Sequence, residues 1–189
     1  ILKDLGVNIN TIPVMDLLQK STHEIIKGRS YSNNLKTVKT LGKFCTSFLK
    51  VKKIASVVKH APGHGCANVD SHKKLPVVNK KANRLYYKDF SAFKNLKSHF
   101  LMTAHVLYKK IDSKSLATHS KKIINKIIRK QLKFKGLVIS DDISMKALRG
   151  DLDLNAKKAL NSGCNLVLYC KGEIKESKKL LKNLQRIDK

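Results

Sequence analysis

Two short segments of the chain carry residue types that suit acid/base and nucleophilic chemistry. The first is Lys-His-Ala-Pro-Gly-His-Gly at 59–65, followed by Asp-Ser-His at 70–72. Asp70 and His72 are two residues apart, so a turn can place the carboxylate against one imidazole nitrogen. Such a partner fixes the tautomer and raises the proton affinity of the other nitrogen. This pair therefore suits a general acid/base that works near neutral pH.

The second segment is Gly-Leu-Val-Ile-Ser-Asp-Asp-Ile-Ser-Met at 136–145. An apolar strand that runs straight into two carboxylates gives one of them a partly desolvated position at the strand end. Asp141 or Asp142 could then act as a nucleophile or stabilise a developing positive charge.

A third segment, Gly-Arg-Ser-Tyr-Ser at 28–32, holds one of only five arginines in the chain. An exposed arginine that binds nothing is the ordinary interpretation of such a residue. An arginine beside a row of strand ends can also hold substrate oxygens through its fork of N–H donors. Arg29 is therefore a candidate binding residue.

A metal site is considered and rejected for the same loop. His60 and His64 have the i, i+4 spacing of a helical zinc pair. Pro62, Gly63 and Gly65 disfavour the helix that this spacing requires, and no glutamate lies between the two histidines. We expect neither a metal nor a cofactor.

The elements that must position these residues alternate along the chain. Five short apolar segments are typical of buried strands, at 7–12, 54–58, 100–106, 137–140 and 165–169. Between them lie stretches with helical spacing, such as Leu35, Val38, Leu41, Phe44 and Phe48. A second helical stretch contains residues spaced in the same way: Leu116, Ile123, Ile124, Ile127, Ile128 and Leu132. This alternation predicts a parallel sheet covered by helices, either doubly wound or part of a (β/α)₈ barrel.

Both folds place their functional sites at the carboxyl ends of the strands. Polar residues follow four of the predicted strands in turn: Pro-Val-Met-Asp at 13–16, Lys-His at 59–60, Thr-Ala-His at 103–105 and Ser-Asp-Asp at 140–142. One capping aspartate or one buried histidine would be unremarkable as a structural residue. Four strands in succession predict a single functional rim.

The composition favours a folded protein with a basic surface. The chain has 189 residues, 42% of them hydrophobic, with 40 Lys plus Arg and 13 Asp plus Glu, for a net charge of +27. A basic excess is typical of nucleic-acid binders. Here 35 of the 40 cations are lysines scattered along the chain, which indicates a solvated surface more than a binding face.

No window has the ~18 consecutive apolar residues of a membrane-spanning helix, and the start of the chain lacks the pattern of a signal peptide. Four cysteines occur without metal-ligand spacing. We therefore expect reduced thiols, no membrane partner and a cytoplasmic location.

Taken together, the motifs resemble the bacterial β-N-acetylhexosaminidases of glycoside hydrolase family 3. The resemblance rests on the segments at 59–65 and 70–72, Met-Thr-Ala-His at 102–105, Ser-Asp-Asp-Ile-Ser-Met at 140–145 and Gly-Cys-Asn at 163–165. It implies a TIM (β/α)₈ barrel that removes terminal β-linked N-acetylglucosamine with retention of configuration. The implied substrates are N-acetylglucosamine-containing muropeptides or oligosaccharides, mainly peptidoglycan fragments recycled in the cytoplasm.

By this resemblance Asp141 is the nucleophile that forms a covalent glycosyl-enzyme intermediate, and Asp142 shapes the loop beside it. His72 is the general acid/base, with Asp70 as its dyad partner. A histidine in this role departs from the usual pair of carboxylic acids, so the carboxyl-separation rule for retaining enzymes does not apply.

The same resemblance implies that Arg29, Lys59 and His60 bind the sugar. His64 and His105 are expected to hold the site together structurally. No cofactor is implied.

The length suggests an incomplete domain. A (β/α)₈ barrel usually takes ~250 residues, whereas this chain has signals for five strands. We expect one glycoside hydrolase family 3 N-terminal-type barrel domain over 1–189, lacking its first strands, with no nucleic-acid partner, and a monomer when full length. The alternatives are a basic protein that binds an anionic polymer or nucleic acid on a degenerate, inactive barrel, or an inactive remnant.

Overall fold

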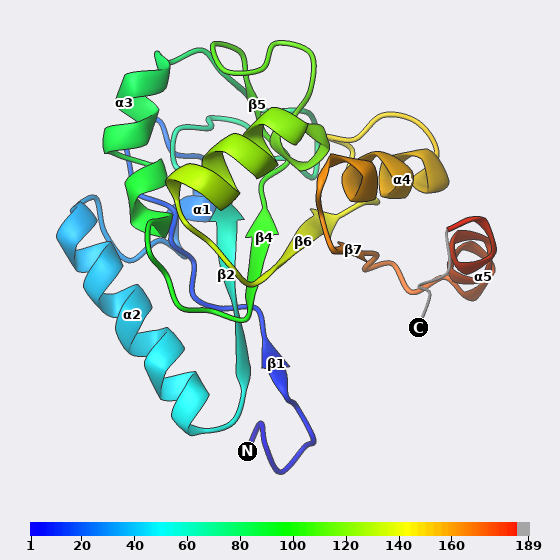
Figure 1. The fold of residues 1–189 in the computed structure, drawn as a ribbon, viewed down its shortest axis with the longest axis horizontal. Helices are drawn as coiled ribbons and strands as arrows, with labels where there is room; N and C mark the ends of the chain where they lie inside the picture. Colours follow the sequence, from blue (N-terminus) through cyan, green and yellow to red (C-terminus); the bar gives the residue numbers. More distant parts are fainter. Residues whose placement is uncertain (185–189) are drawn as a thin grey trace.

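A five-stranded parallel sheet forms the centre of the molecule (Figure 1). The computed structural model describes residues 1–184. Neighbouring strands in the sheet are all parallel. Their spatial order is β1 (Ile9–Asn10), β2 (Ala55–Ala61), β4 (Phe100–Thr103), β6 (Leu137–Asp142) and β7 (Leu166–Leu168). Because all neighbouring strands are parallel, all five carboxyl ends lie along one rim.

Helical segments connect these strands. They are α1 (Glu24–Lys27), α2 (Leu35–Val51), α3 (Ala82–Tyr87), the 3₁₀-helices η1 (Phe90–Phe93) and η2 (Ala117–His119), the π-helix η3 (Lys122–Gln131), α4 (Leu152–Ser162) and α5 (Ile174–Asn183). A separate two-stranded parallel sheet pairs β3 (Val77–Val78) with β5 (Leu107–Tyr108). Helix α2 connects β1 to β2, η3 leads into β6, and α4 connects β6 to β7 (Figure 1).

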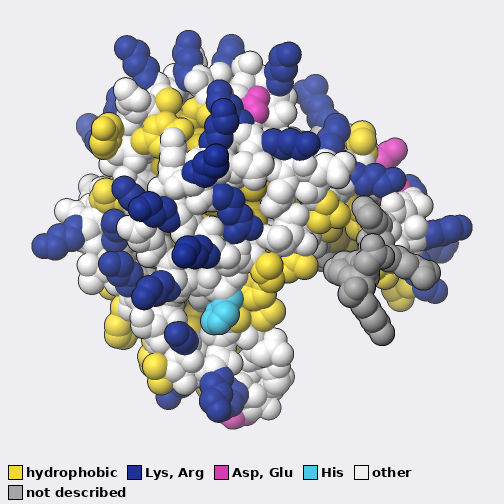
Figure 2. All heavy atoms as spheres, in the orientation of Figure 1, with side chains coloured by type: hydrophobic (Ala, Val, Ile, Leu, Met, Phe, Trp, Pro, Cys, Tyr) yellow, Lys and Arg dark blue, Asp and Glu magenta, His cyan; other side chains and the backbone are white. Residues whose placement is uncertain are grey.

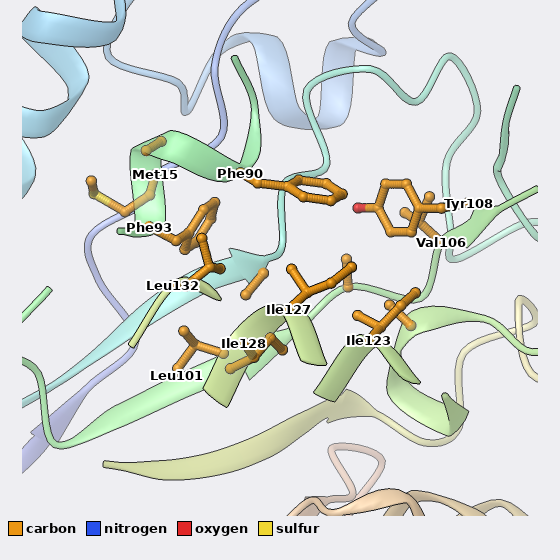
Figure 3. Close-up of a cluster of buried hydrophobic side chains, with 14 of the residues drawn as sticks. Met15, Phe90, Phe93, Leu101, Val106, Tyr108, Ile123, Ile127, Ile128 and Leu132 are labelled. Atoms are coloured by element: carbon orange, nitrogen blue, oxygen red, sulfur yellow. The ribbon is translucent and has the colours of Figure 1, made fainter. Parts of the chain in front are cut away.

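The main core lies between the sheet and the segments η1 and η3 (Figure 3). Four isoleucines of η3 are buried at the spacing expected from the sequence, Ile123, Ile124, Ile127 and Ile128. Phe90 and Tyr108 pack edge to face, with ring centroids 5.3 Å apart, which is a favoured aromatic geometry. The strands whose ends carry the candidate site residues are therefore packed into this core.

Helix α2 is confirmed, but only the first part of the expected apolar stripe contacts the core, through Leu35 and Val38. Phe44 and Phe48 are 68% and 52% exposed. The buried row is Val38, Gly42, Thr46 and Leu49. These are mostly small side chains, and a Cβ at Gly42 would collide with the sulfur of Met15. The helix therefore contacts the core through this row, and the aromatic side chains of Phe44 and Phe48 stay exposed.

The predicted strands are all present with changed bounds. The strand expected at 100–106 ends at Thr103, and the chain then enters the small sheet at β5. The strands expected at 54–58 and 137–140 extend to Ala61 and Asp142, so Lys59, His60 and Asp141 lie within strands. The fold is an α/β half-barrel whose sheet ends at β1 and β7 in residues 1–184. A closed eight-stranded barrel stays a prediction.

Lys and Arg side chains are spread widely over the face drawn in Figure 2, among few acidic ones. This distribution agrees with scattered lysines on a solvated surface. All four cysteines are free thiols. Among the described helices, none combines the length and the apolar character needed to cross a membrane.

Gly65 is expected to be essential for the fold of the loop after β2. A Cβ at this position would collide with the backbone carbonyl of Leu17, which cannot move aside as a side chain could. We expect Gly65→Ala to lower the free energy of unfolding by about 2–4 kcal/mol in urea denaturation. Gly28→Ala is the matched control, because a Cβ at Gly28 meets nothing within 4 Å. Equal stability of the two variants would contradict the collision.

Candidate active site at the strand ends

One cleft of about 360 Å³ lies at the carboxyl ends of the strands. It is lined by residues from seven separate parts of the chain: Thr11, Ile25, Ile26, Arg29, Lys59, His60, His64, Ser71, His72, Met102, Asp141, Met145, Leu168 and Cys170. Five of the six residues singled out from the sequence are in this set. The sixth, Asp70, lies behind His72 and contacts it.

Asp141 lies near the end of β6, and the backbone of the next residue holds its carboxylate. Its side chain is 13% exposed, and Oδ1 accepts a hydrogen bond of 2.9 Å from the backbone N–H of Asp142. Oδ2 lies 4.0 Å from Nε2 of His60. One carboxylate oxygen is thus fixed by the backbone while the other faces the cleft. This is a suitable arrangement for a nucleophile.

His60, near the end of β2, is fixed by a buried carboxylate. Its Nδ1 lies 2.7 Å from Oδ2 of Asp16, whose side chain is 0% exposed. Asp16 also accepts hydrogen bonds from the backbone N–H groups of His60 and His64. Burial raises the pKa of Asp16, but His60 and its hydrogen bond outweigh burial and hold the pKa below the ordinary value of 3.8.

Asp70 and His72 form the pair that their spacing predicts. Oδ1 of Asp70 lies 2.8 Å from Nδ1 of His72 and accepts a hydrogen bond of 2.8 Å from the backbone N–H of the same residue. Burial raises the pKa of Asp70, but these two hydrogen bonds lower it by more than burial raises it, so the net shift is downwards. The His72 ring is 52% exposed, which leaves Nε2 free for a ligand.

Two cations, Arg29 and Lys59, also line the cleft. Arg29 follows α1, and its Nε donates a hydrogen bond of 2.7 Å to the carbonyl of Ile25. Lys59 is half-buried in β2. Burial and then the nearby Arg29 lower the pKa of Lys59. These cations give the cleft donors for the oxygens of a polar ligand.

The side chains of His105 and Asp142 hold the site together by hydrogen bonds, whereas the ring of His64 makes none with the described residues. His105 is fully buried and joins Thr118 Oγ1 at 2.7 Å to the carbonyl oxygen of Asp142 at 3.0 Å. Asp142 accepts hydrogen bonds from the backbone of Ser144 and Cys170, and so ties the loop after β6 to the end of β7. His64 is 2% exposed and lines the cleft, and its two ring nitrogens have no partner among the described residues.

His60 lies in β2 and His64 in the loop after it, so their i, i+4 spacing is not that of a helical pair. Nδ1 of His60 is occupied by Asp16, and the two rings meet edge to face with centroids 6.0 Å apart. Within residues 1–184, no group of three or more His, Cys, Asp or Glu side chains is arranged to hold a metal ion.

Asp16 is the residue that the sequence analysis did not select. Its position after the first predicted strand was visible, but a strand-end aspartate is commonly a cap. Only the structure shows that residues 13–15 run alongside Lys59, with Met15 N–H donating to the Lys59 carbonyl at 2.7 Å. That pairing brings Asp16 beneath His60. Met145 and Cys170 also line the cleft and carried no signal beyond their places after strands.

Acid is expected to destabilise the protein through His64. Burial lowers the pKa of His64 to about 4, from 6.5 in an exposed histidine. Between these values the unfolded chain binds a proton at His64 and the folded chain does not, so the free energy of unfolding falls as the pH decreases from 6.5 to 4. The difference corresponds to up to about 3 kcal/mol.

Urea denaturation between pH 7 and 4.5 measures this effect. A His64→Leu variant should lose less stability on acidification than the unmodified protein. His119, whose pKa burial also lowers to about 4, leaves a remaining pH dependence in both proteins. An unchanged pH dependence in the variant would show that His64 is not buried in its neutral form.

Comparisons with known proteins identify the family of the chain. Residues 2–189 match the Glycosyl hydrolase family 3 N terminal domain. The chain is 32% identical to a beta-hexosaminidase from Bordetella pertussis, over 97% of this chain and 53% of the relative. It is 35% identical to a beta-hexosaminidase from Haemophilus influenzae, over 88% of this chain and 48% of the relative. The chain thus spans about half the length of the curated relatives it matches.

Solved structures give the same result. A family 3 beta-N-acetylglucosaminidase from Paenibacillus superposes with a TM-score of 0.91 at 30% identity, over 96% of this chain and 36% of that protein. Native NagZ from Neisseria gonorrhoeae superposes with a TM-score of 0.88 at 28% identity, over 100% of this chain and 55% of that protein. The half-barrel therefore corresponds to a part of these larger folds.

Proposed function

Because the chain belongs to the glycosyl hydrolase family 3 N-terminal domain family, we propose that its cleft hydrolyses terminal β-linked N-acetylglucosamine with retention of configuration. One observation carries the proposal. Five residues with the required chemistry line a single cleft: Arg29, Lys59, His60, His72 and Asp141. The named relatives are beta-hexosaminidases and a beta-N-acetylglucosaminidase.

In the first step, a carboxylate oxygen of Asp141 attacks the anomeric carbon of the sugar. The bond between that carbon and the glycosidic oxygen breaks, and Nε2 of His72 gives its proton to the departing oxygen. The contact with Asp70 suits His72 to this role, since the Asp70 carboxylate holds Nδ1 at 2.8 Å and leaves Nε2 to face the ligand. The product of the step is a covalent glycosyl ester of Asp141.

In the second step, water replaces Asp141 at the anomeric carbon. Nε2 of His72 takes a proton from the water, the new carbon–oxygen bond forms, and the bond to Asp141 breaks. Two displacements on the same carbon restore the starting β configuration. The enzyme returns to its original protonation state, and no cofactor is needed.

Arg29, Lys59 and His60 are proposed to bind the hydroxyl and acetamido groups of the sugar. The two cations also suit a substrate that carries carboxylates, such as a peptide-bearing muramic acid in a muropeptide. This chemistry supports a role in peptidoglycan turnover. The free cysteines agree with the cytoplasm as the location in which that role would be carried out.

Binding of nucleic acid or another anionic polymer is not favoured as the main function. The basic side chains are spread over the visible surface, and the family and the named relatives are those of glycosidases (Figure 2).

The direct test is hydrolysis of 4-nitrophenyl β-N-acetylglucosaminide followed by proton NMR of the sugar released. We expect the β anomer as the first product, with the matching α-glycoside and β-glucoside turned over much more slowly. A muropeptide should be cleaved faster than its peptide-free counterpart, and Lys59→Gln should reduce this preference. An α anomer as first product would contradict retention, and inactivity towards all hexosaminides would contradict the function.

A further inference from the structure

The completely buried carboxylate of Asp16 contacts His60, one of the residues that line the cleft. Asp16 follows β1 but does not line the cleft itself, and its side chain is completely buried. The preceding segment is anchored on β2, where Val14 and Lys59 form a parallel bridge and Met15 donates to the Lys59 carbonyl. Asp16 is therefore held against the backbone of the strand that carries His60.

Both oxygens of Asp16 are used to hold this strand end. Oδ1 accepts a hydrogen bond of 2.6 Å from the backbone N–H of His64, and Oδ2 lies 2.7 Å from Nδ1 of His60. The backbone N–H of His60 lies 3.3 Å from each oxygen. An ionised carboxylate with these donors is well satisfied despite its burial. The lowered pKa of Asp16 agrees with that state.

This contact decides which nitrogen of His60 faces the cleft. An ionised carboxylate only accepts hydrogen bonds, so Nδ1 of His60 must carry a proton. Nε2 then lies on the opposite side of the ring, 4.0 Å from Oδ2 of Asp141. Asp16, His60 and Asp141 thus form a line from the buried interior to the proposed nucleophile.

We propose that Asp16 is a positioning residue that fixes the tautomer and orientation of His60, so that Nε2 is presented to Asp141 and to the sugar. The role in catalysis rests on the proposed function. The role in holding His60 does not, because it follows from the hydrogen bonds alone. When the carboxylate that holds a histidine is replaced by an amide, the tautomer of the histidine is no longer fixed, and kcat falls.

The first test uses the unmodified protein and needs no activity. Nitrogen NMR of the histidine rings distinguishes a proton on Nδ1 from one on Nε2. We expect Nδ1 of His60 to carry a proton near neutral pH. A neutral His60 ring with its proton on Nε2 alone would overturn the proposal.

The second test compares two aspartates that are matched in their contacts. Asp16→Asn should change the ring-nitrogen signals of His60 and lower kcat/KM for the aryl glycoside by about 10²-fold. Asp112→Asn is the control, because Asp112 also accepts three hydrogen bonds and its pKa is also lowered, but none of its three partners lines the cleft. The control should stay within about threefold of the unmodified protein.

A double-mutant cycle separates positioning from general structural damage. In a His60→Ala background, Asp16→Asn should cost less than about threefold, because there is no ring left to position. A full 10²-fold loss in that background, or no loss in the unmodified background, would overturn the proposal. If the unmodified protein cleaves no hexosaminide, the proposed function fails, and the NMR result still decides whether Asp16 fixes His60.

Discussion

Asp141→Ala is expected to lower kcat/KM for aryl β-N-acetylglucosaminides by at least about 10⁴-fold while the protein stays folded. Loss of a nucleophile that forms the covalent intermediate has an effect of this size or larger. The side chain is 13% exposed and its only described hydrogen bond is to the backbone of Asp142, so little of the fold depends on it. Steady-state kinetics and a denaturation curve measure the two effects.

Azide provides the control for this prediction. A small anion can occupy the space left by the carboxylate and attack the anomeric carbon once, so azide should restore turnover and give the α-glycosyl azide. Asp142→Asn is the matched neighbour. It should weaken the loop contacts with Ser144 and Cys170, reduce activity less, and gain nothing from azide. If Asp142 variants showed the azide rescue and Asp141 variants did not, the two roles would be reversed.

His72→Ala is expected to reduce activity in a way that depends on the leaving group. A dinitrophenolate leaves without a proton, so kcat/KM for that substrate should fall only about tenfold. A poor leaving group such as 4-methylphenolate needs the proton, and its kcat/KM should fall by about 10³-fold or more. The exposed ring of His72, held by Asp70 at 2.8 Å, is the geometric basis for this expectation.

Asp70→Asn should show the same dependence on leaving group with smaller losses, because it removes the partner of His72 and not the proton donor itself. Equal losses for good and poor leaving groups in His72→Ala would contradict the acid role. In that case His72 would contribute to binding instead.

The sequence predicts the site better than it predicts the packing. Consecutive parallel strands bring their carboxyl ends together whatever the loops do, and so Lys59, His60 and Asp141 could be placed on one rim from their positions alone. The Asp70–His72 contact is local in the chain and follows from a spacing of two residues. The first prediction follows from the common direction of the strands and the second from local spacing, so neither depends on how the side chains pack.

The parts that could not be predicted depend on long-range packing. Asp16 is 44 residues from His60 in the sequence, and its contact exists only because residues 13–15 pair with Lys59. Similarly, helical spacing in α2 is compatible with two faces. In the structure the helix contacts the core through Val38, Gly42, Thr46 and Leu49, and a Cβ at Gly42 would meet the side chain of Met15.

Covalent trapping tests the central claim most directly. A 5-fluoro-N-acetylglucosaminyl donor slows both steps but forms the intermediate faster than water removes it, so a glycosyl ester should accumulate and be found by mass spectrometry of the peptides. We expect the label on Asp141, with none on Asp142 and none in Asp141→Ala. A label on any other residue, or none in a preparation that turns over the aryl glycoside, would contradict Asp141 as the nucleophile.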